Sequence, residues 1–394
     1  MISRPDTEAD VRRALSRNPI CALLGPRQCG KTTLAHRLQS DGKPSHFFDL
    51  EKPGDLARLA NPEGALSPLR GLVILDEIQR QPELLPVLRV LADRKPRRAR
   101  FLILGSAAPE LIRGASESLA GRIEFVEMSG FLMDEIGHER IDRLWIRGGF
   151  PKSFLASSEA ASLAWRENFI QTFIERDVPQ LGVTIAAPAL RRFWTMMAHY
   201  HGAIWNGSEI GGSLGVAHTT VTRYLDLLSQ AFVMRRLLPW SENTGKRVVK
   251  SPKVYIRDSG LLHALLGLPS QNVISAHPKL GASWEGFVIE QIVAWAGERN
   301  SYFWATQRGA ELDLLVLAHG RRFGFEIKRN ERPSVTRSMR IALADLNLEQ
   351  LFVIYPGPNR FPMDDRIECL GLSHLDTARR IVLRKTAGRS LRLN

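Results

Sequence analysis

Eight consecutive residues, from Gly25 to Thr32, have the types and spacing of a loop that wraps around phosphate groups, G-x-x-x-x-G-K-T. Glycine at both ends permits backbone angles that turn successive N–H groups inward, and a following helix directs its positive end at the same anion. Lys31 would reach the outer phosphates, and the Thr32 hydroxyl would bind Mg²⁺. We expect nucleotide contacts from Gly25, Pro26, Arg27, Gln28, Cys29, Gly30, Lys31, Thr32 and Thr33.

A second chemical element is the acidic pair that ends the apolar run LVILDE, residues 72–77. Carboxylates at the end of a buried strand are costly unless a cation or water meets them. We therefore expect Asp76 to bind Mg²⁺, directly or through water. Glu77 would polarise the water that attacks the terminal phosphate, as in-line phosphoryl transfer requires.

Two further residues complete the predicted catalytic set of Lys31, Glu77, Ser106 and Arg122. Ser106 ends the apolar run FLILGS and would contact the γ-phosphate or the attacking water; a turn residue or helix cap is its alternative role. Arg122 precedes the strand-like run IEFVEM. It is either an arginine finger in a neighbouring subunit's site or an ordinary surface or salt-bridged arginine, and the sequence favours neither.

The stretch 206–257 has the pattern of a helix-turn-helix followed by a β wing. Residues 208–214 predict a short helix, Gly215 a turn, and residues from His218 a second helix that would present its front to the major groove of DNA. Predicted DNA contacts are Thr219, Thr220, Thr222 and Arg223 on this helix and Lys246, Arg247, Lys250 and Lys253 on or near the wing. The alternative is a module for packing or protein contact.

Near the C-terminus, Asp313 lies on one predicted strand and Glu326 and Lys328 on the next. Alternate strand residues share a face, so Glu326 and Lys328 would point the same way, with Asp313 beside them. Two carboxylates holding Mg²⁺ next to a lysine suit metal-assisted phosphodiester cleavage. The arrangement resembles the PD-(D/E)xK nuclease core, in which Glu285 or Glu290 would match the acidic helix residue, although Leu312 replaces the family's proline. Alternatively, these charges form an ion-pair cluster in a fold kept for binding or assembly.

The elements that position these residues suggest an α/β protein of three domains. β-like runs alternating with helices over residues 1–145 predict a parallel sheet covered on both faces, the nucleotide domain. Residues 146–270 form a helical region that includes the winged helix, and residues 271–394 return to a mixed α/β, nuclease-like pattern.

Composition narrows the class of partner. The chain has 54 Lys and Arg against 41 Asp and Glu, a net charge of +13. This favours a polyanion such as DNA, without excluding RNA; an arginine-rich solvated surface is the alternative. No apolar run reaches the ~18 residues of a membrane span. Three cysteines without a CxxC pair and a start without an apolar signal core predict a cytoplasmic protein without disulfides or zinc.

The chain resembles the AAA+ ATPases, and more narrowly a prokaryotic AAA+ family with a restriction-endonuclease-like C-terminal domain of unknown function. The motifs that carry the resemblance are GPRQCGKTTL, VILDEIQ, LILGSA, LAGR, RGGFP, ERDV, YLDLL and DSGLL. The resemblance implies ATP with Mg²⁺, hydrolysis, and a homo-oligomer such as a hexameric ring. Our interpretation is a DNA-dependent motor such as a helicase or translocase. An ATP-gated metal-dependent nuclease and a nucleotide-controlled switch or scaffold for protein partners remain the alternatives.

Overall fold

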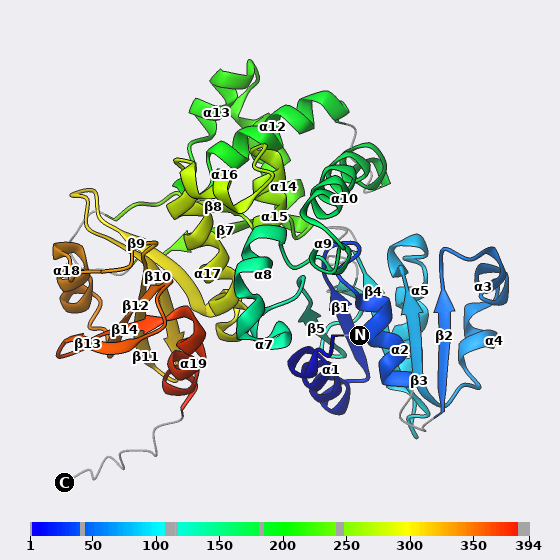
Figure 1. The fold of residues 1–394 in the computed structure, drawn as a ribbon. Coiled ribbons are helices and arrows are strands. Elements are labelled where there is room, and N and C mark those ends of the chain that lie inside the picture. Colours follow the sequence, from blue (N-terminus) through cyan, green and yellow to red (C-terminus); the bar gives the residue numbers. More distant parts are fainter. Residues whose placement is uncertain are drawn as a thin grey trace, which may run out of the picture. The chain divides into compact units, whose positions relative to one another are not determined.

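The computed structural model describes residues 2–39, 44–106, 115, 117–180, 185–241 and 248–384 (Figure 1). Contacts group the chain into two compact units, one of Met1–Ala187 with Leu225–Val233 and one of Pro188–Tyr224 with Met234–Asn394. The range 206–257 expected to form a winged helix is therefore divided between the two units. Each unit is described here by itself.

The first unit is built on a five-stranded parallel sheet with the order β2-β3-β4-β1-β5, which confirms the predicted parallel α/β layer. The strands are β1 (Ile20–Leu24), β2 (Ser45–Asp49), β3 (Gly71–Asp76), β4 (Ala99–Gly105) and β5 (Ile123–Glu127). Leu24 is in register with Gly105, so the turns that follow β1 and β4 start at the same edge of the sheet.

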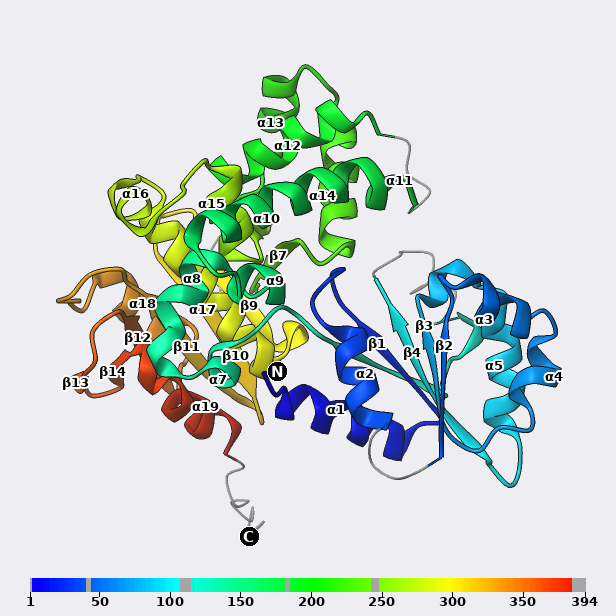
Figure 2. The ribbon, with the colours of Figure 1, turned by 45° about the vertical axis from the view of Figure 1, so that its right-hand side comes forward.

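Helices cover both faces of this sheet because its strands are apolar on both sides. Ile20, Ala22 and Leu24 pack in one core with α5 (Leu84–Asp93), near α3 (Pro53–Arg58) and α4 (Pro62–Leu66). The intervening Cys21 and Leu23 pack in a second core with α1 (Pro5–Arg17) and α2 (Lys31–Gln39), on the opposite face (Figure 2).

A helical segment continues the first unit beyond the sheet. It comprises α7 (Met133–Ile136), α8 (Ile141–Arg147), α9 (Pro151–Phe154), α10 (Glu159–Thr172) and α11 (Val178–Gln180), with a 3₁₀ turn (His138–Arg140) between α7 and α8. A π-helical turn, η3 (Phe173–Asp177), joins α10 to α11. Such turns are rare and occur often at functional sites.

The second unit has a nine-stranded mixed sheet with the order β13-β14-β12-β11-β10-β9-β7-β8-β6. The strands are β6 (Ala203–Ile204), β7 (Met234–Pro239), β8 (Lys253–Ile256), β9 (Ser301–Ala305), β10 (Glu311–Ala318), β11 (Arg321–Ile327), β12 (Gln350–Tyr355), β13 (Arg360–Asp364) and β14 (Ile367–Gly371). β7 runs parallel to β9, with Leu238 opposite Tyr302. Strands of the expected middle and C-terminal domains therefore share one sheet.

Helices pack on both faces of the second sheet. Met339 and Ala342 of α18 (Arg337–Asp345) share a core with Leu312, whereas Trp295 of α17 (Leu280–Ala296) contacts Phe325. The unit also contains α12 (Ala187–His199), α13 (Gly207–Leu214), the start of α14 (His218–Gln230), α15 (Ser259–Leu265), α16 (Gln271–Ala276) and α19 (Leu375–Leu383).

Candidate functional site

The loop between β1 and α2 folds around the ammonium group of Lys31. Lys31 Nζ donates hydrogen bonds of 2.9 Å to the carbonyl oxygens of Gly25 and Pro26, and the side chain is buried. Gly30 has φ of +106°, in the region that favours glycine. A Cβ on Gly25 would lie 2.0 Å from the carbonyl oxygen of Met128, so no larger residue fits there. The local geometry therefore explains why glycine is needed at both positions of the motif.

Thr32 and Asp76 meet at the same edge of the sheet. Thr32 Oγ1 donates a 2.7 Å hydrogen bond to Asp76 Oδ2, and the backbone N–H of Glu77 donates to Asp76 Oδ1 at 3.0 Å. Burial raises the pKa of Asp76, as does the charge of Glu77, while the Thr32 hydrogen bond opposes the rise. Hydroxyl and carboxylate oxygens are the hard ligands that Mg²⁺ prefers, so this pair fits a nucleotide-bound magnesium ion.

Glu77 and Ser106 are joined by Gln79, a residue that the sequence did not single out. Gln79 Nε2 donates to Glu77 Oε2 and, at 3.0 Å, to Ser106 Oγ, which is itself 3.5 Å from Glu77 Oε2. Glu77 has φ of +56°, which is uncommon for a residue with a side chain. The only available signal for Gln79 was its place two residues after the acidic pair.

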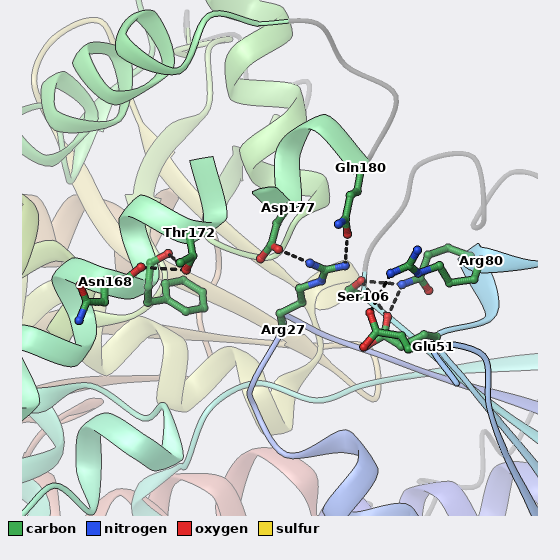
Figure 3. A network of polar contacts seen from close by, with 11 residues as sticks. Arg27, Glu51, Arg80, Ser106, Asn168, Thr172, Asp177 and Gln180 are labelled. Carbon is green, nitrogen blue, oxygen red and sulfur yellow. Dashed lines mark hydrogen bonds and ion pairs between the residues drawn. The ribbon is translucent and has the colours of Figure 1, made fainter. Parts of the chain in front are cut away.

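Arg27 reaches out of the phosphate loop to the end of the π-helical turn (Figure 3). Its guanidinium forms an ion pair with Asp177 and donates a 2.7 Å hydrogen bond to Gln180 Oε1. Burial raises the pKa of Asp177; Arg27 opposes the rise, and the charge of Glu77 adds to it. The same figure shows Glu51 and Arg80, which form a separate and more exposed ion pair.

A second arginine, Arg4, holds the phosphate loop through side-chain hydrogen bonds. Nothing in the sequence singled this residue out. Arg4 Nη1 donates to the carbonyl oxygens of Cys29 at 3.3 Å and Ser129 at 2.9 Å, and Nε donates to Glu135 Oε1 at 2.9 Å. The side chain is buried. Arg4 thereby ties the loop to the segment that follows β5.

Arg122 lies at the opposite edge of the sheet from the phosphate loop. Its carbonyl oxygen accepts a hydrogen bond from the N–H of Ile20, the first residue of β1, whereas the loop follows the last residue of that strand. Its guanidinium donates to both carboxylate oxygens of Asp93, at 2.7 and 2.8 Å. Within this chain, Arg122 is thus salt-bridged, the second of its two predicted roles. Its role as an arginine finger in a neighbouring subunit's site stays a prediction.

The predicted DNA contacts differ in exposure. On α14, Thr219 and Arg223 are exposed, Thr220 and Thr222 are half-buried, and Thr222 Oγ1 donates to the carbonyl oxygen of His218 at 2.9 Å. Lys250 is exposed. Lys246 and Arg247 lie outside the described residues.

The predicted acidic cluster in the second unit partly assembles. Lys328 Nζ donates to Glu326 Oε1 at 2.6 Å, and Asp313 Oδ2 accepts from the N–H of Ile327 at 2.8 Å. Asp313 lies where the pairing of β10 with β9 shifts in register, between Leu312 and Leu315. Burial raises the pKa of Asp313 well above its usual range, and the nearby carboxylates of Glu285 and Glu326 add to the rise.

Lys253 enters this cluster, contrary to its predicted place among phosphate contacts on the wing. Its side chain is only 5% exposed and forms ion pairs with Glu285, at 3.2 Å, and Glu311. Tyr255 OH donates a further 2.6 Å hydrogen bond to Glu285. Lys253 lies on β8, a strand inside the sheet, and its side chain is therefore buried rather than solvated.

Glu290 does not join the cluster, which corrects one of the two alternatives for the helix carboxylate. It is buried and forms ion pairs with Arg235 and Arg257. Burial works against its charge, but the two arginines hold the pKa of Glu290 below its usual value. Glu285 is the helix residue next to Asp313 and Glu326.

Most carboxylates of this cluster pair with lysine side chains. In the part of the chain that the structure describes, no group of three or more His, Cys, Asp or Glu side chains is placed to hold a metal. The ammonium groups of Lys253 and Lys328 lie against three of its four carboxylates, those of Glu285, Glu311 and Glu326.

No described helix is long and apolar enough to cross a bilayer.

Three family models match successive parts of the chain. Residues 17–137 match an AAA domain (AAA_14), residues 138–272 a domain of unknown function (DUF8612), and residues 280–375 a domain of unknown function (DUF4143). The match to residues 17–137 spans all five strands of the parallel sheet and the phosphate loop. With the loop, Lys31 and Asp76 at one edge of that sheet, these findings define a P-loop ATPase of the AAA type.

Two curated proteins are similar over most of their length. These are the uncharacterized proteins Mb2031c of Mycobacterium bovis and Rv2008c of Mycobacterium tuberculosis, each 55% identical over 367 residues, which cover 93% of this chain and 83% of theirs. The chain belongs to the family of these mycobacterial proteins.

Solved structures resemble the chain more distantly. The Walker-type ATPase PABY2304 of Pyrococcus abyssi is 14% identical, with a TM-score of 0.49, over 68% of this chain and 96% of its own. A signal transduction ATPase of Pyrococcus horikoshii, PH0952, is 12% identical, with a TM-score of 0.30, over 76% of this chain and 47% of its own. The family assignment rests on the sequence matches.

Proposed function

We propose that the chain binds ATP with Mg²⁺ at the phosphate loop and hydrolyses the bond between the β and γ phosphates. The observation that carries the proposal is the 2.7 Å hydrogen bond between Thr32 and Asp76, because it brings two oxygen ligands from separate segments together beside Lys31. Lys31 binds the outer phosphates, Thr32 and Asp76 hold the magnesium ion, and Glu77 accepts a proton from the attacking water. Ser106, through Gln79, orients Glu77 and that water.

Steady-state ATPase assays and nucleotide titrations test this assignment. Lys31→Ala should abolish ATP binding, and Glu77→Gln should keep binding and lower kcat by roughly 10²–10⁴-fold, as expected for a lost general base. Lys52→Ala and Glu51→Gln are matched controls, because both side chains are exposed and belong to the same unit. Hydrolysis that survives Lys31→Ala would contradict the assigned site.

We further propose that ATP turnover is coupled to DNA binding or remodelling, as in a helicase or translocase, with residues 206–257 as a winged helix. Support comes from the net charge of +13 and from the exposure of Thr219, Arg223 and Lys250. RNA would satisfy the same phosphate contacts. Assembly into a homo-oligomer, with Arg122 acting in a neighbour's site, belongs to the same proposal.

Salt dependence of DNA binding tests the coupling. If Arg223 contacts phosphate, Arg223→Ala should weaken binding to duplex, single-stranded and branched DNA alike and should reduce the slope of log K against log[salt] by about 1. Arg308→Ala, an exposed arginine outside the range 206–257, is the control. DNA that neither binds nor stimulates the ATPase would favour the nucleotide-controlled switch. The nuclease alternative would instead show metal-dependent cleavage of DNA that Asp313→Ala or Lys328→Ala removes while the ATPase activity is kept.

A further inference from the structure

Arg27 lies within the phosphate loop, yet its charged end is held by a different part of the first unit. The pairs that it forms with Asp177 and Gln180 join residues 150 and 153 positions apart in the chain. The ion pair is largely shielded, with 18% of the Arg27 side chain and 13% of the Asp177 side chain exposed. A shielded, two-partner contact holds a guanidinium in one place, unlike a mobile surface arginine.

The position of Arg27 relative to the proposed chemistry is defined by its neighbours. Lys31 Nζ lies 2.9 Å from the carbonyl oxygen of Pro26, and the carbonyl carbon of Pro26 is bonded to the backbone nitrogen of Arg27. Arg27 therefore leaves the backbone next to the ammonium that would bind the outer phosphates. At its other end, its partner Asp177 lies close enough to Glu77 to be affected by that charge. The pair of Arg27 and Asp177 thus starts in the loop that holds Lys31 and lies near enough to Glu77 for its charge to act on Asp177.

The other arginine considered for this task is differently placed. Arg122 lies beside Ile20, the first residue of β1, whereas the phosphate loop follows the last residue of that strand. Within one chain it cannot approach the loop. Arg27 is therefore a better candidate than Arg122 for a positive charge that the same chain places near the γ-phosphate.

We propose that Arg27 is a catalytic residue that contacts the γ-phosphate in cis, and that Asp177 and Gln180 are positioning residues that hold its guanidinium. As charge develops on the transferred phosphoryl oxygens and the leaving oxygen, the guanidinium stabilises it; the water proton passes to Glu77, and ADP and phosphate leave. An arginine in this role is worth roughly 10³–10⁵-fold in kcat. The π-helical turn that ends at Asp177 gives the positioning carboxylate its place.

This inference rests on the proposed ATPase function, so the experiment must separate the two. The variants are Arg27→Ala, Arg27→Lys, Asp177→Asn and Gln180→Ala, with Arg80→Ala as a matched control, because Arg80 forms an exposed ion pair with Glu51 in the same unit. Arg122→Ala tests the rival arginine in the same series. Three quantities are measured for each full-length protein: kcat, the Kd of ATP, and the Kd of ADP with and without aluminium fluoride.

Arg27→Ala should lower kcat by roughly 10³-fold or more while changing the Kd of ATP only a few-fold, since the arginine acts in the transition state. It should also remove the tightening of ADP binding by aluminium fluoride, which mimics the transferred phosphoryl group. Millimolar guanidinium should partly restore its turnover. Asp177→Asn should lower kcat by about tenfold, with Gln180→Ala less severe, because each leaves the guanidinium present but less firmly held.

Two results overturn the inference. Arg27→Ala with wild-type kcat, in a protein that Glu77→Gln inactivates, would remove Arg27 from catalysis and leave the ATPase proposal intact. Loss of ATP binding equal to the loss of kcat would make Arg27 a ground-state ligand instead. If the wild type neither binds nor hydrolyses ATP, the ATPase proposal itself fails and the role of Arg27 fails with it.

Discussion

The ammonium group of Lys253 lies 3.2 Å from Glu285 Oε1, and it also pairs with Glu311. A lysine with 5% of its side chain exposed is stable only because its charge is matched. Carboxylates from a helix and a strand meet a cation that the chain itself supplies. This contact gives the first two predictions.

Replacing Lys253 should destabilise the second unit. Lys253→Met keeps the length of the side chain but leaves two carboxylates without their cation, and breaking a buried pair costs about 3–5 kcal/mol. Denaturant unfolding followed by tryptophan fluorescence measures the loss. Lys250→Met, an exposed lysine three residues earlier, should change stability little. Equal midpoints for the two variants would show that the pairs contribute nothing.

The second unit should not bind divalent metal at its acidic cluster. Lys253 and Lys328 already lie against its carboxylates, so Mn²⁺ would have to displace them. Nucleotide-free protein titrated with Mn²⁺ should behave the same as Asp313→Asn and should cleave no DNA. Mn²⁺ binding that disappears in Asp313→Asn would restore the metal-nuclease alternative.

The stability of the second unit should fall with pH below about 6.5. Both ring nitrogens of His201 are used: Nδ1 accepts from the N–H of Ile256 at 3.0 Å, and Nε2 donates to the carbonyl oxygen of Ala282 at 3.1 Å. Burial, helped by Lys279 nearby, lowers the pKa of His201 from 6.5 to about 3, although Ala282 and Glu290 oppose the shift. Between pH 3 and pH 6.5, the unfolded chain therefore binds a proton at His201 that the folded chain does not bind.

The contribution of His201 is therefore complete above pH 6.5 and is lost as the pH falls toward 3, by about 1.4 kcal/mol per unit. Hydrogen exchange of the β8 amides across this range measures it. His201→Gln keeps a donor and an acceptor but no titrating ring, so its slope should be smaller by about one proton. The same slope in both proteins would show that His201 does not titrate on unfolding.

Two glycines of α17 should respond oppositely to alanine. A Cβ on Gly286 would lie 2.4 Å from His201 Nε2, a ring held on both sides by hydrogen bonds, so Gly286→Ala should cost about 1–3 kcal/mol through overpacking. Gly281 has open space around it, and Gly281→Ala should stabilise the helix by about 0.5–1 kcal/mol. Thermal unfolding of both variants gives the comparison; a stabilised Gly286→Ala would contradict the tight contact.

The sequence predicted the parts of the fold that depend on local pattern. The five strands of the first unit followed from continuous apolar runs, because a parallel sheet buries both of its faces. The AAA class followed from the loop and the acidic pair. The contact of Lys328 with Glu326 agrees with the expected two-residue alternation of a strand.

Contacts between distant segments were beyond the same reasoning. Glu285 and Glu290 are five positions apart on one helix, and only the placement of Arg235 and Arg257 decides which of them is taken up in ion pairs. Lys253 lies in a basic stretch of the sequence, which suggested an exposed side chain. In the structure β8 is part of the sheet, and the Lys253 side chain is buried. Nothing local in the sequence relates Arg27 to Asp177, because the partners are 150 residues apart.

The pairing of β7 with β9 has a practical consequence for anyone who cuts the gene. A shortened protein that stops near residue 270 would retain β7 and lose the strand beside it, which exposes an unpaired sheet edge prone to aggregation. Insolubility of such a fragment would then reflect where the cut was made rather than any role of the missing residues. A cut before Pro188 keeps the five-stranded sheet whole, but it also removes Leu225–Val233, which belong to the first unit.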